Sequence, residues 1–239
     1  MKRALVTGGS GAIGDAICRR LAADGMHVIV HANRNPDGAL RLCEELVRKG
    51  HSAQMVRFDV TDLAECESTL EALAEEAPIQ VVINNAGIHD DAVFPGMNPQ
   101  QWHGVIDVSL NGFFNVTKPL VMPMIRTRWG RIVNITSIAG ITGNRGQTNY
   151  AAAKGALHAA GKSLALELAS RGITVNSVAP GIIESPMIAK AFDRESISRL
   201  VPMKRAGRPE EVAGLVGYLA SEEAAYVTGQ VISINGGMI

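Results

Sequence analysis

Residues 4–14 read ALVTGGSGAIG, a short apolar run that ends in a turn with glycines spaced three apart. Ile13, Ile17 and Leu21 then recur at the spacing of an amphipathic helix, and a second apolar run occupies residues 27–30. A strand, a glycine turn, a helix and a strand in this order are typical of a parallel βαβ unit. In such a unit the glycines let the backbone approach a pyrophosphate, and the helix N-terminus supplies free N–H groups.

The same alternation of strand and helix patterns continues along the chain. Strands alternating with helices indicate a parallel sheet covered by helices on both faces. With 239 residues, of which 46% are hydrophobic and 19% charged, we expect one α/β domain over residues 1–239, a Rossmann-type doubly wound sheet. Residues 184–205 are polar and less periodic, and no element is assigned there. The further strands are expected at residues 53–58, 80–83, 130–136, 173–178 and 230–234.

Polar or glycine residues follow several of these strands directly. They are Asp59, Asn84-Asn85, Ser137 and Pro180-Gly181. The carboxyl ends of parallel strands meet at one edge of the sheet, and ligands bind beyond that edge. The sequence therefore predicts a single site to which all these positions contribute.

Composition excludes several classes of partner. Lys plus Arg and Asp plus Glu both number 23, so a net charge of zero gives no reason to expect nucleic acid. Cys18, Cys43 and Cys66 occur singly without histidines at metal-ligand spacing, so we expect reduced, buried thiols and no metal. The chain start lacks a signal-peptide apolar region, and no apolar run is long enough to span a membrane. We expect a soluble, cytoplasmic protein.

Ser137, Tyr150 and Lys154 form the candidate catalytic group. Tyr150 and Lys154 are four residues apart in a helix expected from residue 148 to about residue 170, so they share one face. An ammonium beside a phenol favours the phenolate and is expected to lower the tyrosine pKa toward the range of a general acid or base. Ser137, at a strand end, can hydrogen-bond a substrate oxygen. The spacing alone is weak, because it also occurs on many solvated helix faces.

The end of the second strand indicates which dinucleotide is preferred. A carboxylate there binds the ribose 2′-hydroxyl of NAD, whereas a basic residue accommodates the 2′-phosphate of NADP. Residues 31–35 read HANRN, which contains no carboxylate but does contain Arg34. This favours NADPH. The alternative is that Arg34 is an ordinary solvated loop charge.

Together these motifs resemble the short-chain dehydrogenase/reductase family over essentially the whole chain. Within it, the runs NYAAAKGAL, ASRGITVN and NGGM most resemble the 3-oxoacyl-(acyl-carrier-protein) reductases. The motifs that carry the resemblance are TGGSGAIG at 7–14, NNAG at 84–87, Ser137 with YAAAK at 150–154, NSVAPG at 176–181 and NGG at 235–237.

The resemblance implies roles for individual residues. Tyr150 gives a proton to a carbonyl oxygen while NADPH delivers hydride to the carbon, Ser137 hydrogen-bonds that oxygen, and Lys154 holds the nicotinamide ribose and depresses the Tyr150 pKa. The implied cofactor contacts are Gly8, Gly9, Ser10, Gly11 and Ile13 for the pyrophosphate, Asn33 and Arg34 for the 2′-phosphate, Asp59 and Val60 for the adenine, Asn85 for the adenosine, Tyr150 and Lys154 for the nicotinamide ribose, and Ile183 for the nicotinamide amide.

The chain departs from the family pattern at three positions. Ala12 replaces a glycine, and Gly11 stands where the acyl-carrier reductases usually carry an arginine. The family's fourth catalytic residue, an asparagine, aligns with Ser109. Asn111 lies two positions further, nearly opposite on a helix, and is not expected to replace the missing side chain.

The implied activity is NADPH-dependent reduction of a 3-oxoacyl thioester, bound to an acyl carrier protein, to the 3-hydroxyacyl thioester, as in fatty-acid or related polyketide biosynthesis. Carrier proteins are acidic, and Arg126, Arg128 and Arg131 cluster before the Ser137 strand. The resemblance links Arg128 and Arg171 to carrier docking and implies a homotetramer. The alternative for these arginines is a favourable interaction with the helix dipole.

Two other functions stay open from the sequence. A relative of the same fold could reduce or oxidise a free small alcohol, polyol or ketone, since substrate contacts are expected from the variable residues 88–97 and 184–203. A non-catalytic dinucleotide-binding protein is the second alternative. The presence of Ser137, Tyr150 and Lys154 together favours an enzyme over that protein.

Overall fold

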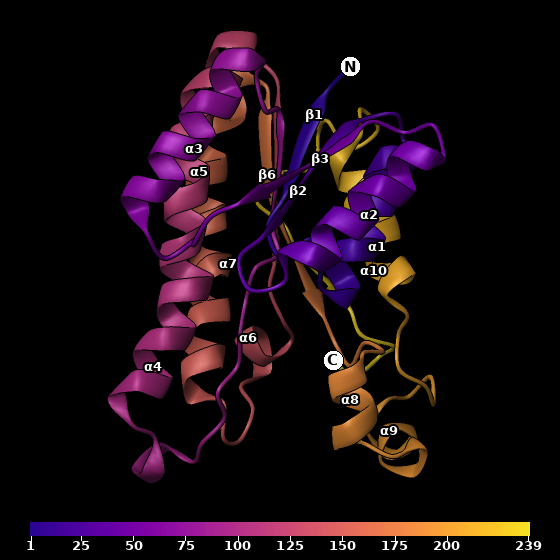
Figure 1. Cartoon of the computed structure of the whole chain (residues 1–239). Helices are drawn as coiled ribbons and strands as arrows, with labels where there is room; N and C mark the ends of the chain where they lie inside the picture. The colour runs from indigo at the N-terminus through magenta and orange to yellow at the C-terminus, as the bar shows by residue number, and fades with distance from the viewer.

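Seven parallel strands form one sheet in the order β3-β2-β1-β4-β5-β6-β7 in the computed structural model (Figure 1). The structure describes residues 1–239, with the side chains of residues 187, 190 and 191 outside the description. The strands are β1 (Arg3–Val6), β2 (His27–Ala32), β3 (Ala53–Arg57), β4 (Val81–Asn84), β5 (Gly130–Ile135), β6 (Ile173–Pro180) and β7 (Val231–Ile234).

Helices connect these strands. The longer helices are α1 (Ala12–Ala23), α2 (Pro36–Arg48), α3 (Leu63–Glu76), α4 (Pro99–Ile106), α5 (Gly112–Thr127), α7 (Thr148–Leu168) and α10 (Pro209–Ala220). The shorter ones are η1 (Phe94–Gly96), the π-helical turn η2 (Asp107–Asn111), α6 (Ala139–Thr142), η3 (Ala169–Arg171), α8 (Pro186–Ala191) and α9 (Arg194–Leu200).

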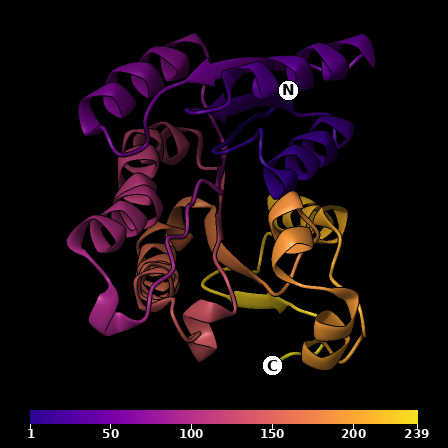
Figure 2. The ribbon, with the colours of Figure 1, turned by 60° about the horizontal axis from the view of Figure 1, so that its bottom comes forward.

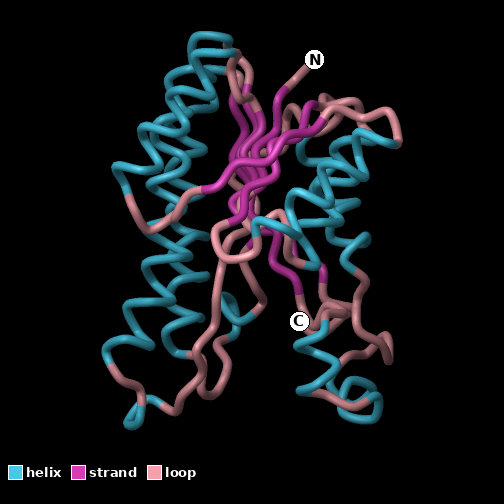
Figure 3. Tube along the Cα trace, viewed as in Figure 1, coloured by secondary structure: helices cyan, strands magenta, loops and turns pink.

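The sheet lies between two layers of helices. Figure 1 shows α1, α2 and α10 on one face and α3, α5 and α7 on the other, and Figure 3 shows the strands enclosed between the two layers. Each layer closes its own apolar core over the sheet. Every residue of β1, β4 and β6 is buried, as expected for parallel strands covered on both faces. The predicted fold class is therefore confirmed.

The strand order changes direction at β1: β2 and β3 lie on one side of it, and β4 to β7 lie on the other. Val6 pairs with Val30 of β2 on one side and with Ile83 of β4 on the other. The loops after β1 and β4 therefore leave the sheet toward opposite faces. Doubly wound folds bind ligands in the crevice between two such loops. The strand ends predicted to share one site do lie along this single carboxyl edge.

The segment over residues 184–205 contains two short helices, α8 and α9, that apolar periodicity does not predict. Ser185 and Asp193 cap them by accepting hydrogen bonds from the N–H groups of Ile188 and Ser196. Capping, not an apolar stripe, defines these helices, so a periodicity argument misses them. Figure 1 shows α8 and α9 below the carboxyl edge of the sheet, and Figure 2 shows both on the same side of the molecule as α10.

Among the described residues, no helix is both long enough and apolar enough to cross a membrane.

The three cysteines are free and buried, as expected, and burial raises the pKa of each thiol.

Candidate active site

The glycine turn between β1 and α1 is a tight backbone structure. Gly8 has a φ of +62°, which favours glycine, and a methyl group on Gly14 would stand 2.2 Å from the Gly8 carbonyl oxygen. Thr7 Oγ1 accepts hydrogen bonds from the N–H groups of Asn85 and Ala86, both at 2.9 Å. The turn after β1 is therefore fastened to the turn after β4.

The N-terminus of α1 offers free donors beside this turn. The first N–H groups of a helix have no intrahelical acceptor, and Gly11 provides no side-chain cap. By contrast, the N–H groups of Gly8 and Gly9 point toward His31, and that of Gly11 bonds the Gly8 carbonyl. Uncapped donors and a turn that tolerates no added methyl at Gly14 fit the pyrophosphate of a dinucleotide.

The loops after β2 and β3 meet next to the turn. Hydrogen bonds from the Thr61 N–H and hydroxyl, then the Asn33 side chain and the Arg34 charge, lower the pKa of the Asp59 carboxyl against its partial burial. Asn33, Arg34 and Asp59, which the sequence assigned to the adenosine end of the cofactor, therefore lie together. Val60 is buried, and its carbonyl oxygen accepts a hydrogen bond from Asn115 at 2.9 Å.

The Asn85 side chain is hydrogen-bonded to the glycine turn. Its Nδ2 donates to the carbonyl oxygens of Thr7 and Gly8, at 2.9 and 3.1 Å. Only its Oδ1 is left for a ligand, so any contact of this side chain with an adenosine would be as an acceptor.

Ser137, Tyr150 and Lys154 lie together at the carboxyl end of β5. Ser137 Oγ accepts a hydrogen bond from Ala139 N–H at 3.1 Å, and the Ser137 side chain acts on the Tyr150 phenol by lowering its pKa. Lys154 is 3% exposed; its Nζ donates to the Ile135 carbonyl oxygen at 2.9 Å and stands 5.6 Å from the centre of the Tyr150 ring. Nζ also lies 3.2 Å from where a side chain on Gly87 would begin, so the lysine faces the loop after β4.

The pKa of Tyr150 differs from the expectation. Burial raises it above its ordinary value, the Asp91 charge adds to the rise, and only the hydrogen bond with Ser137 opposes it. Lys154 donates to a backbone carbonyl instead of to the phenol, so the expected lowering by the ammonium is wrong for this arrangement. A protonated phenol is the resident form, and it is the form that a proton donor needs.

Burial lowers the pKa of Lys154 from 10.5 to about 8. Because the unfolded chain holds this proton up to a higher pH, the cost of burying the charge is present below about pH 8 and is relieved as the pH rises toward 10.5. We expect Lys154→Met to remove this dependence. Between about pH 7 and about pH 9.5 the wild type should gain about 2 kcal/mol of unfolding free energy relative to the variant. Urea denaturation of both proteins at the two pH values measures the difference, and parallel pH profiles would contradict it.

Ser109 lies in the π-helical turn η2, between α4 and α5. Its side chain is 3% exposed, and its Oγ has no hydrogen-bond partner among the described residues. A side chain on Gly87 would begin 3.6 Å from this Oγ, on the side where Lys154 also faces. Asn111 instead bonds Asp107 at the surface, at 2.7 Å, so it does not replace the missing asparagine, as expected.

Two residues at the site have no sequence signal of their own. Asn149, which is fully buried, donates to the carbonyl oxygens of Asp90 and Gln101 and accepts the N–H of Tyr150. Asp91 accepts a hydrogen bond from Gln147 at 2.8 Å. These contacts fasten the loop after β4 to the start of α7, and they depend on residues that are far apart in the sequence.

Ile183 lies on the far side of the site, after β6. It forms a parallel bridge with Gly207, in which Gly207 N–H donates to Ile182 and the Gly207 carbonyl accepts from Glu184. In this pattern the N–H and C=O groups of Ile183 itself face away from Gly207. The Ile183 side chain is 6% exposed and packs in the core, so a ligand would meet its backbone.

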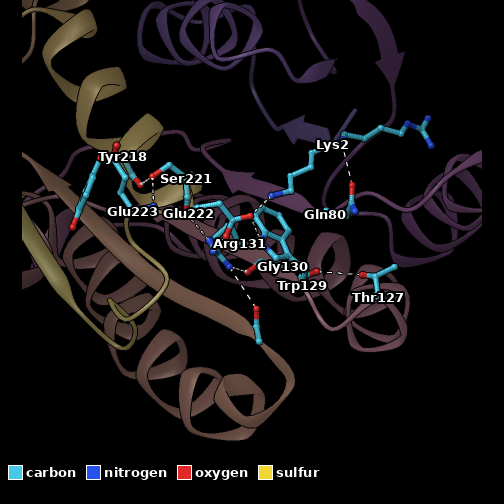
Figure 4. Close-up of polar contacts among 12 residues, drawn as sticks. Lys2, Gln80, Thr127, Trp129, Gly130, Arg131, Tyr218, Ser221, Glu222 and Glu223 are labelled. Atoms are coloured by element: carbon cyan, nitrogen blue, oxygen red, sulfur yellow. Dashed lines mark hydrogen bonds and ion pairs between the residues drawn. The ribbon is translucent and has the colours of Figure 1, made fainter.

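Arg131 does not belong to a basic surface patch, contrary to the sequence-based grouping with Arg126 and Arg128. Its side chain is 2% exposed and lies over the Trp129 ring, with an ion pair to Glu222 at 3.4 Å (Figure 4). Arg131 belongs to β5, and its charge interacts with Glu222 and Trp129 instead of with a partner protein.

Arg128 and Arg171 are exposed, and they lie at the amino ends of β5 and β6. The Arg128 guanidinium donates to the carbonyl oxygen of Ser170 at 3.1 Å, so these two arginines are neighbours. Ser137 follows the opposite end of β5. The length of that strand, about 20 Å for its six residues, therefore separates the pair from the catalytic candidates.

A single parallel sheet of this order, with a glycine turn after its first strand, defines a Rossmann-type α/β protein. A family model described as Enoyl-(Acyl carrier protein) reductase matches residues 8–239. The chain belongs to the short-chain dehydrogenase/reductase family. It is thus an oxidoreductase of a family that uses NAD(P), and the residues present fit that group.

Relatives cover nearly the whole chain. Nodulation protein G of Azospirillum brasilense is 42% identical over 240 residues, which are 99% of this chain and 98% of that protein. The 3-oxoacyl-(acyl-carrier-protein) reductase of Escherichia coli is 44% identical over 240 residues, 99% of this chain and 97% of that one. The acetoacetyl-CoA reductase of Cupriavidus necator is 41% identical over 239 residues, 98% of this chain and 97% of that one.

Proposed function

We propose that this protein reduces a 3-oxoacyl thioester to the 3-hydroxyacyl thioester with NADPH, the acyl group being carried by an acyl carrier protein. The observation that carries the proposal is the group of Ser137, Tyr150 and Lys154 at the same sheet edge as the glycine turn. Similarity to 3-oxoacyl-(acyl-carrier-protein) and acetoacetyl-CoA reductases supports the thioester.

When bound at this edge, NADPH would supply the hydride for the new C–H bond at the ketone carbon. The electron pair of the carbonyl π bond moves to the oxygen, and Tyr150 transfers its phenolic proton to that oxygen. Ser137 donates a hydrogen bond to the same oxygen and so stabilises its developing charge. Lys154, held by the Ile135 carbonyl, would orient the nicotinamide ribose.

We assign the remaining cofactor contacts along the sheet edge. The turn residues Gly8, Gly9, Ser10 and Gly11, with the N–H of Ile13, would surround the pyrophosphate. Asn33 and Arg34 would meet the 2′-phosphate, Asp59 and Val60 the adenine, Asn85 the adenosine, and the Ile183 backbone the nicotinamide amide.

The activity is tested with purified protein, NADPH and acetoacetyl thioesters of carrier protein and of coenzyme A. We expect NADPH oxidation with the thioesters to be faster than NADPH oxidation with free small ketones and faster than NADP+ reduction with free polyols. Rapid turnover of a free ketone with inert thioesters would instead favour the small-molecule reductase. Binding of NADPH without turnover of any of these substrates would favour a non-catalytic protein.

Cofactor preference is expected to depend on Arg34. Its charge acts on Asp59 at the adenosine end, so Arg34→Glu places a negative charge where the 2′-phosphate would lie. We expect the NADPH KM to rise at least about tenfold, while the NADH KM changes less than about threefold. Arg41→Glu, the same charge change at an exposed position of α2, is the control. An equal effect on both cofactors would contradict the assignment.

Carrier docking is expected to use Arg128 and Arg171. Reversing both charges, Arg128→Glu with Arg171→Glu, should raise the KM for the carrier-bound thioester about tenfold or more, because an acidic partner is then repelled. Turnover of the coenzyme A thioester should be unchanged, since β5 separates these residues from Tyr150. Loss of both activities in parallel would show that the pair does not act through docking.

We further propose the family-typical homotetramer. Light scattering tests it, since four chains of 25.3 kDa should scatter as one particle of about four times that mass. A monomer at micromolar concentration would refute it.

A further inference from the structure

His31, the fifth residue of β2, connects two separate parts of the dinucleotide edge. Its Nδ1 lies 3.2 Å from the N–H of Gly8 in the glycine turn, and its Nε2 lies 2.9 Å from the carbonyl oxygen of Phe58, just before Asp59. The His31 carbonyl oxygen also accepts the N–H of Gly9 at 2.8 Å. One residue thus bonds the turn after β1 twice and the loop after β3 once.

These partners permit one chemical form of the ring. A backbone N–H can only donate, so Nδ1 must accept; a carbonyl oxygen can only accept, so Nε2 must carry the proton. The neutral Nε2–H tautomer satisfies both bonds. In a doubly protonated ring, Nδ1 would also carry a proton, so two donors would face each other at the Gly8 N–H.

The surroundings of the ring favour that form. His31 is 2% exposed, and its ring packs on Phe58 with a centroid separation of 4.0 Å. Burial lowers the pKa of His31, whereas the Phe58 carbonyl and the negative charges of Asp59 and Glu65, from the loop after β3 and from α3, oppose that shift.

The bond to Gly8 constrains the part of the turn that a pyrophosphate would approach. Gly8 has φ +62°, and a Cβ there would lie 3.2 Å from Ala86 Cα and from Asn85 Nδ2, so one side of the turn is closed by the loop after β4. The His31 ring, from β2, meets the N–H of the same residue. Without it, the half-buried Gly8 N–H would lose its acceptor within the fold and the turn could rotate to find another.

We infer that His31 is a positioning residue for the dinucleotide: its neutral ring holds the Gly8 N–H and fixes the glycine turn relative to the loop after β3. This inference rests on the proposed binding of the cofactor at residues 8–14 and not on the substrate. His31 touches no reacting atom, so it acts on cofactor affinity and leaves the proton-transfer group unchanged.

Two substitutions separate the two bonds. His31→Asn retains an acceptor, Oδ1, at the place of Nδ1 but cannot reach Phe58. His31→Gln reaches the place of Nε2 with a donor but offers no acceptor to Gly8. His27→Gln, at the other end of β2 where the histidine bonds Ser52, is the matched control.

The measurements are the Kd for NADPH by calorimetry, the midpoint of thermal unfolding, and hydrogen exchange of the peptide that contains Gly8 in cofactor-free protein. We expect His31→Gln to weaken NADPH binding about tenfold and to speed exchange at Gly8, while His31→Asn stays within about threefold of the wild type. Ring ¹⁵N shifts of the wild type should report a proton on Nε2 alone.

Several outcomes would overturn the inference. Wild-type affinity in both variants, or equal weakening in both without a change in Gly8 exchange, would show that the ring does not act through the turn. A proton on Nδ1 in the wild type would do the same without any variant. Failure of the wild type to bind NADPH or NADH would overturn the proposed cofactor, and this inference with it.

Discussion

Tyr150→Phe is expected to lower the turnover number about 10²- to 10⁴-fold, with the NADPH Kd within about threefold of the wild type. The substitution removes one oxygen atom and leaves the ring, which packs beside Lys154 with Nζ 5.6 Å from its centre. Ser137 loses its partner in the phenol, but its bond from Ala139 N–H is unaffected. The variant therefore removes the proposed proton donor without moving the rest of the site.

Because burial raises the pKa of the Tyr150 phenol, removing the hydroxyl should slow the proton-transfer step and leave cofactor binding unchanged. Single-turnover reduction with NADPH at saturating thioester, together with the NADPH Kd, separates the two. Tyr226→Phe is the control, since that side chain is fully exposed at 102%. Turnover of Tyr150→Phe at the wild-type rate would remove Tyr150 from the mechanism.

Gly14→Ala is expected to weaken NADPH binding about 100-fold and to lower the unfolding free energy by about 1–3 kcal/mol. The added methyl would stand 2.2 Å from the Gly8 carbonyl oxygen and 2.9 Å from both Asn85 Nδ2 and Gly9 Cα. These neighbours are backbone or hydrogen-bonded atoms, so the turn itself must shift. The gain of about 1 kcal/mol that alanine ordinarily brings to a helix interior does not offset such a clash.

Gly214→Ala is the matched control for this prediction. It also lies inside a helix, α10, but its nearest neighbour would be the end of the Arg20 side chain at 3.8 Å. We expect it to keep the wild-type NADPH affinity and to be neutral or slightly stabilising. NADPH titration and urea denaturation of both variants provide the comparison. Equal affinities for Gly14→Ala and Gly214→Ala would show that the turn is not the pyrophosphate site.

Local sequence patterns predict much of this fold. The seven strands fall within a residue or two of their expected places, because a parallel strand buried on both faces reads as a continuous apolar run. The exceptions are short or irregular. The π-helical turn at Asp107–Asn111 interrupts what reads as one helix, and α8 and α9 follow from caps at Ser185 and Asp193.

The candidate site was only partly predictable. Tyr150 and Lys154 are neighbours on one helix, and Ser137 ends a strand, so local spacing suffices to group them at a sheet edge. Asp91 and Asn149 have no such pattern, since their roles arise from contacts between the loop after β4 and the start of α7. Arg131 appears as a surface charge in sequence, whereas the structure buries it against Trp129 and Glu222.

The sequence by itself determined the alternation of strands and helices, the glycine turn and the edge at which the polar residues gather, because each depends on neighbours within a few positions. Tertiary structure alone decided the strand order, the upward shift of the Tyr150 pKa and the place of His31 between Gly8 and Phe58. Those properties depend on burial and on hydrogen bonds between residues more than 20 positions apart, which no local pattern records.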